Sequence, residues 1–191
     1  MFPKKALFIE RRLLHDRDLS KRAPRRTDFA FPGRLIERLR EVPNAGLSLF
    51  VISNEDDIGR GTIPPEAFRR YAAGLERALA SRGVALARAY HCPFAPNGVG
   101  PFRRESVHRL PNVGMMMAAR QDFGVDLRES WLAARTTRAL LAGARAGCLT
   151  ALVEPPGALR ESEFFVEPDA VVPDLASAIQ AIVGHELALM R

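Results

Sequence analysis

The stretch Ala6-Leu7-Phe8-Ile9-Glu10-Arg11-Arg12 places a short apolar run directly before three charged residues. Four consecutive apolar residues at this position are typical of a buried strand, because a strand covered on both faces needs no polar alternation. Charged residues that follow such a strand lie at its carboxyl end, where parallel sheets bind their ligands. The run is too short for a signal peptide, since Glu10 and Arg11 end it at once.

Apolar runs and amphipathic stretches alternate along the rest of the chain. Further strands are expected at Leu47–Ser53, Val84–Tyr90, Ser130–Ala134, Cys148–Val153 and Ala170–Val172. Helices are expected at Gly33–Glu41, Pro65–Arg82, Val113–Phe123 and Thr136–Ala146, and from Asp174 to the end. This alternation predicts an α/β fold, a Rossmann-like three-layer sandwich with a central parallel sheet. No internal repeat or linker stands out, so residues 1–191 are predicted to form a single domain.

Ligands of parallel sheets bind beside the carboxyl ends of the strands. Four polar segments are expected at such ends, and together they form the predicted site. The segments are Glu10–Arg12, Ser53–Asp57, Arg109–Pro111 and Ala134–Arg138.

Composition narrows the class of protein. The 191 residues carry a net charge of +6, and no apolar run approaches the roughly 18 residues that span a bilayer, so no membrane segment is expected. Two cysteines, Cys92 and Cys148, form no disulfide framework, which favours the cytoplasm. The positive charge indicates either an arginine-rich surface or an anionic ligand. Nucleic acid is an unlikely partner, because the basic residues are scattered and no binding module is present.

Motifs at the predicted strand ends resemble those of a known family. The matched segments are Leu7-Phe-Ile-Glu-Arg-Arg-Leu-Leu14 for L-F-L-D-R-D-G-T, Asp28-Phe-Ala-Phe-Pro-Gly33 for D-F-x-F-x-P-G, Ile52-Ser-Asn-Glu-Asp-Asp-Ile-Gly-Arg-Gly61 for V-T-N-Q-S-G-I-A-R-G, Cys92-Pro-Phe-Ala-Pro96 for C-P-H-H-P, Ser106-Val-His-Arg-Leu-Pro-Asn-Val-Gly-Met115 for C-x-C-R-K-P-x-P-G-M, and Leu132-Ala-Ala-Arg-Thr-Thr-Arg-Ala139 for V-G-D-x-x-x-D. From about Lys5 to Val183 the chain is similar to the D-glycero-D-manno-heptose-1,7-bisphosphate and histidinol-phosphate phosphatases of the haloacid-dehalogenase superfamily. The resemblance implies the haloacid-dehalogenase fold with a minimal cap.

The resemblance also implies a mechanism. In that superfamily an aspartate attacks phosphorus, and a second aspartate two residues later acts as acid and base. A lysine adds positive charge, and Mg²⁺ is held by the nucleophile, a backbone carbonyl and another aspartate. By resemblance the nucleophile, acid/base, lysine and metal-ligand positions are Glu10, Arg12, Leu110 and Arg135, and Ser53 takes the phosphate-binding position of the second motif.

These replacements predict loss of catalysis. The extra methylene of Glu10 moves its carboxylate, and a misplacement of about 1 Å can cost about a hundredfold in rate. Arg12 cannot exchange a proton at neutral pH, and Arg135 cannot bind Mg²⁺. No intact catalytic residue and no Mg²⁺ are therefore expected. A shifted register would place the intact pair Asp16 and Asp18 at the catalytic positions instead.

The zinc loop of the family is altered in the same way. Relatives hold Zn²⁺ with three cysteines and one histidine, whereas the corresponding positions here are Cys92, Phe94, Ser106 and His108. Two ligands are too few for a structural zinc site. Residues 91–111 are therefore predicted to form a degenerate zinc-loop insertion, packed by Phe94 and Phe102 and without Zn²⁺.

Two interpretations of the cleft stay open. In one, an anion binds to Arg12, Ser53, Asn54, Arg109 and Arg135, because arginine holds phosphate without a metal. In the other, Arg11 and Arg12 fill the cleft by pairing with Glu10, Asp56 or Asp57. The predicted function is a catalytically inactive phosphatase homologue that binds a phosphorylated small molecule or a protein partner. The alternatives are a divergent sugar-phosphate phosphatase using Glu10 or the Asp16/Asp18 pair, and a basic interaction module.

Overall fold

The computed structural model describes residues 4–14, 29–154 and 165–190. Its six strands are β1 (Lys5–Glu10), β2 (Leu47–Asn54), β3 (Leu86–Cys92), β4 (Trp131–Ala134), β5 (Leu149–Val153) and β6 (Ala170–Val172). They form one sheet in the order β3-β2-β1-β4-β5-β6, and every neighbouring pair is parallel. The helices are α1 (Arg11–Leu14), α2 (Gly33–Glu41), α3 (Asp56–Gly59), α4 (Pro65–Ala80), α5 (Gly114–Phe123), α6 (Thr137–Ala146) and α7 (Leu175–Leu189), with short 3₁₀ turns at Val42–Ala45, Gly100–Phe102 and Leu127–Glu129.

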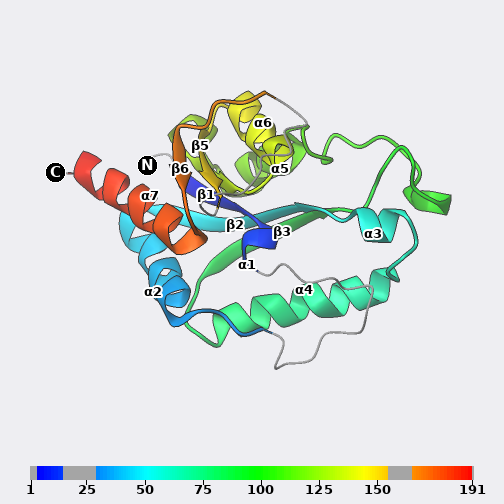
Figure 1. The fold of residues 1–191 in the computed structure, drawn as a ribbon, viewed down its shortest axis with the longest axis horizontal. Coiled ribbons are helices and arrows are strands. Elements are labelled where there is room, and N and C mark those ends of the chain that lie inside the picture. Colours follow the sequence, from blue (N-terminus) through cyan, green and yellow to red (C-terminus); the bar gives the residue numbers. More distant parts are fainter. Residues whose placement is uncertain (1–3, 15–28, 155–164, 191) are drawn as a thin grey trace.

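Helices cover both faces of the sheet (Figure 1). Helices α5 and α6 lie on one face, and α2, α4 and α7 lie on the other. Alternate residues of β1 point to opposite sides: Leu7 and Ile9 belong to the core under α2, α4 and α7, whereas Ala6 and Phe8 belong to the core under α5 and α6. This three-layer arrangement confirms the predicted α/β fold.

The predicted elements are all present, with shifted ends. The strand expected at Val84–Tyr90 is β3, two residues later, because the amide of Val84 donates to the carbonyl of Leu79 and closes the preceding helix. The placement of Arg109–Pro111 at a strand end is wrong, since these residues belong to the loop between β3 and α5. The local periodicity of the sequence cannot show where a long loop returns to the sheet. None of the helices in the described ranges is long and apolar enough to cross a membrane.

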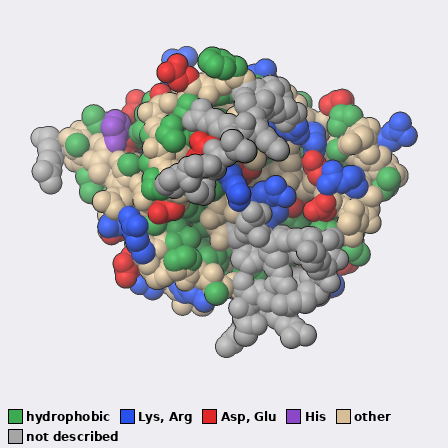
Figure 2. All heavy atoms as spheres, in the orientation of Figure 1, with side chains coloured by type: hydrophobic (Ala, Val, Ile, Leu, Met, Phe, Trp, Pro, Cys, Tyr) green, Lys and Arg blue, Asp and Glu red, His purple; other side chains and the backbone are tan. Residues whose placement is uncertain are grey.

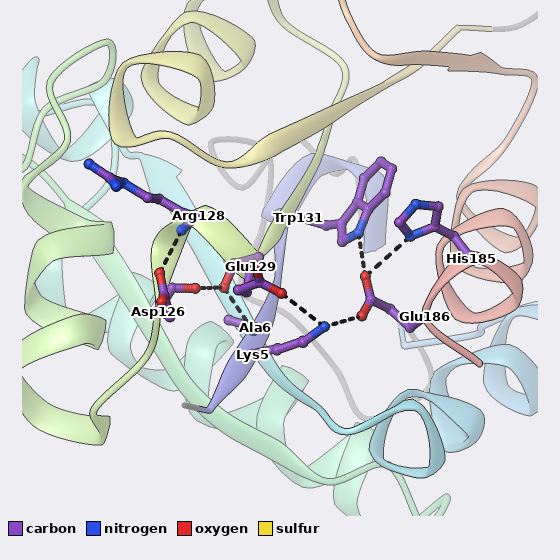
Figure 3. Close-up of polar contacts among 9 residues, drawn as sticks. Lys5, Ala6, Asp126, Arg128, Glu129, Trp131, His185 and Glu186 are labelled. Carbon is purple, nitrogen blue, oxygen red and sulfur yellow. Dashed lines mark hydrogen bonds and ion pairs between the residues drawn. The ribbon is translucent and has the colours of Figure 1, made fainter. Parts of the chain in front are cut away.

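A partly buried ion pair joins α7 to the amino ends of the central strands (Figure 3). Glu186 of α7, 2% exposed, accepts hydrogen bonds from Lys5 at 2.9 Å and from the indole of Trp131 at 3.0 Å. The ring of His185 packs edge-on against Trp131, with centroids 5.4 Å apart. Burial opposes the ionisation of Glu186, but the hydrogen bonds from Lys5 and Trp131 hold its pKa below the ordinary value. The hydrogen bond to Glu186 raises the pKa of Lys5.

Replacing Glu186→Gln is expected to lower the free energy of unfolding by about 2 kcal/mol at neutral pH, because Lys5 and Trp131 lose a charged acceptor. A carboxylate with a lowered pKa stabilises the fold above its unfolded pKa, here near 4.5, and this stabilisation disappears as the pH falls through the folded pKa. Urea unfolding of both proteins across the acidic range measures this difference, which should shrink below about pH 4. A difference that stays constant with pH would contradict the assignment.

Candidate functional site

Glu10, at the carboxyl end of β1, is held by the N-terminal end of α6. Its Oε2 accepts hydrogen bonds from the backbone amides of Arg135 at 2.8 Å and Thr136 at 3.0 Å. Its Oε1 accepts a hydrogen bond from the hydroxyl of Thr136 at 3.1 Å. The contact follows from the topology, because β1 and β4 are neighbours and α6 begins just beyond β4. Glu10 is only 6% exposed, and its carboxylate therefore has a fixed position.

Three arginines belong to the segments that meet at this carboxylate. Arg12 lies two residues beyond Glu10 in α1, and Arg135 lies between β4 and α6; both are exposed. Arg138 follows in the first turn of α6. Figure 2 shows Lys and Arg side chains close together near the middle of the face it presents, with Asp and Glu side chains among them. The structure thus brings the predicted positions Glu10 and Arg135 together, with Arg12 on the helix that follows Glu10.

Asn54 fixes the loop that carries Leu110. Its side chain donates to the carbonyl of Leu110 at 3.1 Å and accepts from the amide of Leu110 at 2.9 Å. The Leu110 side chain, at the lysine position of the family, is 3% exposed and packs in the core with Met115 and Phe8. Asn54 therefore acts as a structural clamp, and both groups of its amide are used within the protein.

Arg109, another predicted anion ligand, is held by the protein itself. Its guanidinium binds both carboxylate oxygens of Asp56 and also donates to the carbonyl of Phe94. Burial opposes the ionisation of Asp56, but Arg109, with the charges of Arg60 and Arg138, keeps its pKa below the ordinary value. Arg109 therefore joins the loop to α3.

Ser53 lies in a second polar cluster. The Ser53 hydroxyl lies 2.6 Å from Glu55 Oε1 and 2.7 Å from His91 Nδ1. Glu55 receives a bidentate pair from Arg11, at 2.7 and 3.1 Å, and Arg11 also donates to Tyr71 at 3.1 Å. Arg11, Ser53 and Glu55 are each 6% exposed or less. Among the described residues, the Ser53 hydroxyl thus bonds within this cluster and not to Glu10.

The position of Ser53 follows from strand alternation. Val51 packs in the core under α4 and Ile52 in the core under α6, so the side chain of Ser53 turns back toward α4. Glu10 instead turns toward α6. The expected pairing of Arg11 with Glu10, Asp56 or Asp57 is likewise wrong, because its ion-pair partner is Glu55. The sequence gives a weak signal for this pair: Arg11 follows a buried strand directly, where a charge needs a partner.

His91 is neutral in this cluster. Burial, together with the charge of Arg11, lowers the pKa of His91 to about 4. Because the Glu55 carboxylate can only accept, the single proton of Ser53 goes to Glu55 and Nδ1–H of His91 donates to Ser53. The cluster of Arg11, Glu55 and neutral His91 therefore carries no net charge.

The loop at the former zinc positions is held by packing and hydrogen bonds. The rings of Phe94 and Phe102 lie 6.1 Å apart, as predicted, and the guanidinium of Arg104 lies 3.7 Å from the centre of the Phe94 ring. The thiol of Cys92 contacts the carbonyl of Phe94, and the hydroxyl of Ser106 accepts from the amide of His108. One thiol and one imidazole at the four positions do not fit a zinc site.

The donors around Glu10 do not fit Mg²⁺ either. Magnesium takes oxygen ligands, whereas positions 12 and 135 carry guanidinium groups, which have only donors. In residues 4–14, 29–154 and 165–190, no three His, Cys, Asp or Glu side chains lie together as an ion would require. Asp16 and Asp18, the alternative catalytic pair, lie outside the described residues.

Comparison with solved structures confirms the fold. A putative haloacid-dehalogenase-like phosphatase from Mesorhizobium loti superposes with a TM-score of 0.77 at 23% identity, covering 97% of this chain and 87% of the other. The D,D-heptose 1,7-bisphosphate phosphatase from B. bronchiseptica, solved with magnesium and phosphate, superposes with a TM-score of 0.72 at 22% identity. The match covers 95% of this chain and 99% of the other. The chain has the fold of the haloacid-dehalogenase-like phosphatases.

Sequence relatives give the family. The D-glycero-alpha-D-manno-heptose-1,7-bisphosphate 7-phosphatase of Burkholderia mallei is 32% identical over 126 residues, which are 65% of this chain and 67% of the relative. The D-glycero-beta-D-manno-heptose-1,7-bisphosphate 7-phosphatase of Escherichia coli K12 is 30% identical over 156 residues, 81% and 82% of the two chains. No family model matches the sequence. The chain belongs to the D-glycero-D-manno-heptose-1,7-bisphosphate phosphatase family.

The family overturns the predicted function. The relatives that show it are named as phosphatases, so the prediction of a catalytically inactive homologue is wrong, and the expectation that the protein is not an enzyme has no support. The prediction rested on the side chains that differ from the family at the catalytic positions. Glu10 nevertheless keeps a carboxylate at the nucleophile position, and two backbone amides fix it. The magnesium in the B. bronchiseptica structure likewise gives no support to the expected absence of a metal cofactor.

Proposed function

We propose that this protein is a phosphomonoester hydrolase that acts on a sugar phosphate, with Glu10 as the nucleophile. The observation that carries the proposal is the carboxylate at the end of β1, fixed by two backbone amides and one hydroxyl. The family assignment supports the substrate class, because its named members act on heptose bisphosphates.

The two oxygens of Glu10 have different environments. Oε2 accepts two amide bonds, while within the described residues Oε1 accepts the hydroxyl of Thr136 alone. A carboxylate oxygen has two lone pairs, so Oε1 keeps one lone pair that can attack phosphorus. Because the two backbone amides hold the carboxylate in one orientation, they reduce the entropy cost of reaching in-line geometry.

The reaction is a two-step transfer. Oε1 forms a bond to phosphorus as the bond from phosphorus to the sugar oxygen breaks, and the departing oxygen takes a proton from water. The hydroxide that remains attacks the phosphorus of the glutamyl phosphate, and the bond from phosphorus to Oε1 breaks, which releases hydrogen phosphate and restores the Glu10 carboxylate. Exposed arginines at positions 12 and 135 place positive charge beside the phosphoryl oxygens.

Phosphate release from a panel of sugar phosphates tests this function. The panel contains the two anomers of heptose 1,7-bisphosphate, monophosphorylated hexoses and a nucleoside monophosphate. The protein is expected to hydrolyse at least one sugar phosphate and to leave the nucleoside monophosphate intact. An absence of release from every compound, with and without divalent cations, would overturn the proposal.

A further inference from the structure

We infer that the phosphoryl site at Glu10 works without a divalent cation. The positive charge comes from the N-terminal end of α6 and from the arginine at position 135. This inference rests on the proposed function for the place of the phosphoryl group. It goes beyond that function by naming which charges meet the anion.

The first support is the set of donors on the Glu10 carboxylate. Three hydrogens, from the amides of Arg135 and Thr136 and the hydroxyl of Thr136, are directed at its two oxygens. They lie at the beginning of the ten-residue helix α6, whose N-terminal end carries about half a positive charge. A cation bound to the same oxygens would replace these donors and meet their positive charge. The helix end thus already offsets part of the negative charge of the carboxylate.

The second support is the residue type at position 135. The family places a metal-ligating aspartate at this position, directly beyond β4, and here the backbone amide of that residue binds Glu10. Arginine has no lone pair to offer a metal, and its charge repels one. Changing aspartate to arginine alters the charge at one position by two units. This change supplies much of the positive charge that a divalent cation would bring to the site.

The third support is the chemistry of guanidinium toward phosphate. Arginine binds phosphate oxygens through two parallel N–H bonds and stays charged at all physiological pH values. The side chains of Arg12 and Arg135 are exposed, and both residues lie on segments that adjoin Glu10, since Arg12 is in α1 directly after it and the backbone amide of Arg135 binds its carboxylate. Their exposure also leaves them able to change partners when an anion binds.

Two binding measurements test the inference without relying on turnover. Electron paramagnetic resonance measures the binding of Mn²⁺ alone, and calorimetry measures the binding of inorganic phosphate in the presence of chelator or of Mg²⁺. The full chain is expected to leave Mn²⁺ free and to bind phosphate with an affinity that changes less than about twofold between the two conditions. Arg135→Asp is expected to weaken phosphate binding in chelator by about tenfold.

The matched control is Arg128→Asp, the same charge change at an exposed arginine. Arg128 precedes β4 and so lies at the amino end of that strand, whereas the proposed site lies at the carboxyl end. It should leave phosphate affinity unchanged. Binding of Mn²⁺ that Glu10→Gln removes, a phosphate affinity that rises with Mg²⁺, or no phosphate binding in either condition would each overturn the inference. A protein that binds phosphate as expected but releases none from any sugar phosphate would overturn only the proposed function.

Discussion

Glu10→Gln is expected to reduce phosphate release by about a thousandfold or more, because the amide oxygen cannot form the glutamyl phosphate. The amide oxygen of glutamine can still accept from the backbone amides of Arg135 and Thr136, while its amide nitrogen faces the Thr136 hydroxyl, which then accepts and no longer donates. Steady-state release of phosphate from the best substrate of the panel measures the effect. The loss should lie in kcat, because the residue acts on the bound substrate.

Two companion variants separate chemistry from folding. Glu10→Asp keeps the charge but withdraws the carboxylate by one methylene, and it is expected to lose about a hundredfold. Glu76→Gln removes an exposed carboxylate on α4 and should leave the rate unchanged. A Glu10→Gln protein that unfolds at the same urea concentration as the parent and still turns over within about tenfold of it would contradict a nucleophilic role.

Glu55→Gln is expected to cost about 3 to 5 kcal/mol of folding free energy, since it leaves the buried guanidinium of Arg11 without its counter-ion. Arg11 is 6% exposed, so water cannot easily replace the lost charge. The same change weakens the acceptor of Ser53. Urea unfolding followed by circular dichroism measures the loss.

The double variant Arg11→Gln with Glu55→Gln removes both charges and serves as the control. It should recover more than half of the lost stability, because a buried neutral pair avoids the cost of an isolated charge. If the single variant lost less than about 1 kcal/mol of folding free energy, the Arg11–Glu55 pair would contribute no more than a surface ion pair.

The fold could be predicted because its signals are local. The run Leu7–Ile9 and the spacing of Phe68, Tyr71, Leu75 and Leu79 each specify one element, and the alternation of such elements specifies the parallel sheet. The site depends on contacts between distant segments. Asn54 and Leu110 are 56 residues apart, and Arg11 and Glu55 are 44 apart. No local pattern in the sequence reports these pairings.

Ser53 shows how a correct motif can give a wrong contact. The match to the second motif places Ser53 at the carboxyl end of β2, where it lies. Its face of the sheet is set by the alternation of β2, which turns it toward Glu55 and His91. The wrong prediction of lost catalysis has a similar origin. The motif positions show which side chains differ from the family, but they do not show that hydrogen bonds from Arg135 and Thr136 fix the carboxylate of Glu10.

Acid quenching of the protein during turnover, followed by mass spectrometry of tryptic peptides, tests the central claim most directly. Trypsin separates the candidates, because Glu10 lies in the peptide Ala6–Arg11, Asp16 in Leu13–Arg17 and Asp18 in the peptide after it. A phosphoryl group on the Ala6–Arg11 peptide, absent from the Glu10→Gln protein, is the predicted result. A phosphoryl group on either of the other two peptides, or on no peptide while substrate is being consumed, would contradict phosphoryl transfer to Glu10.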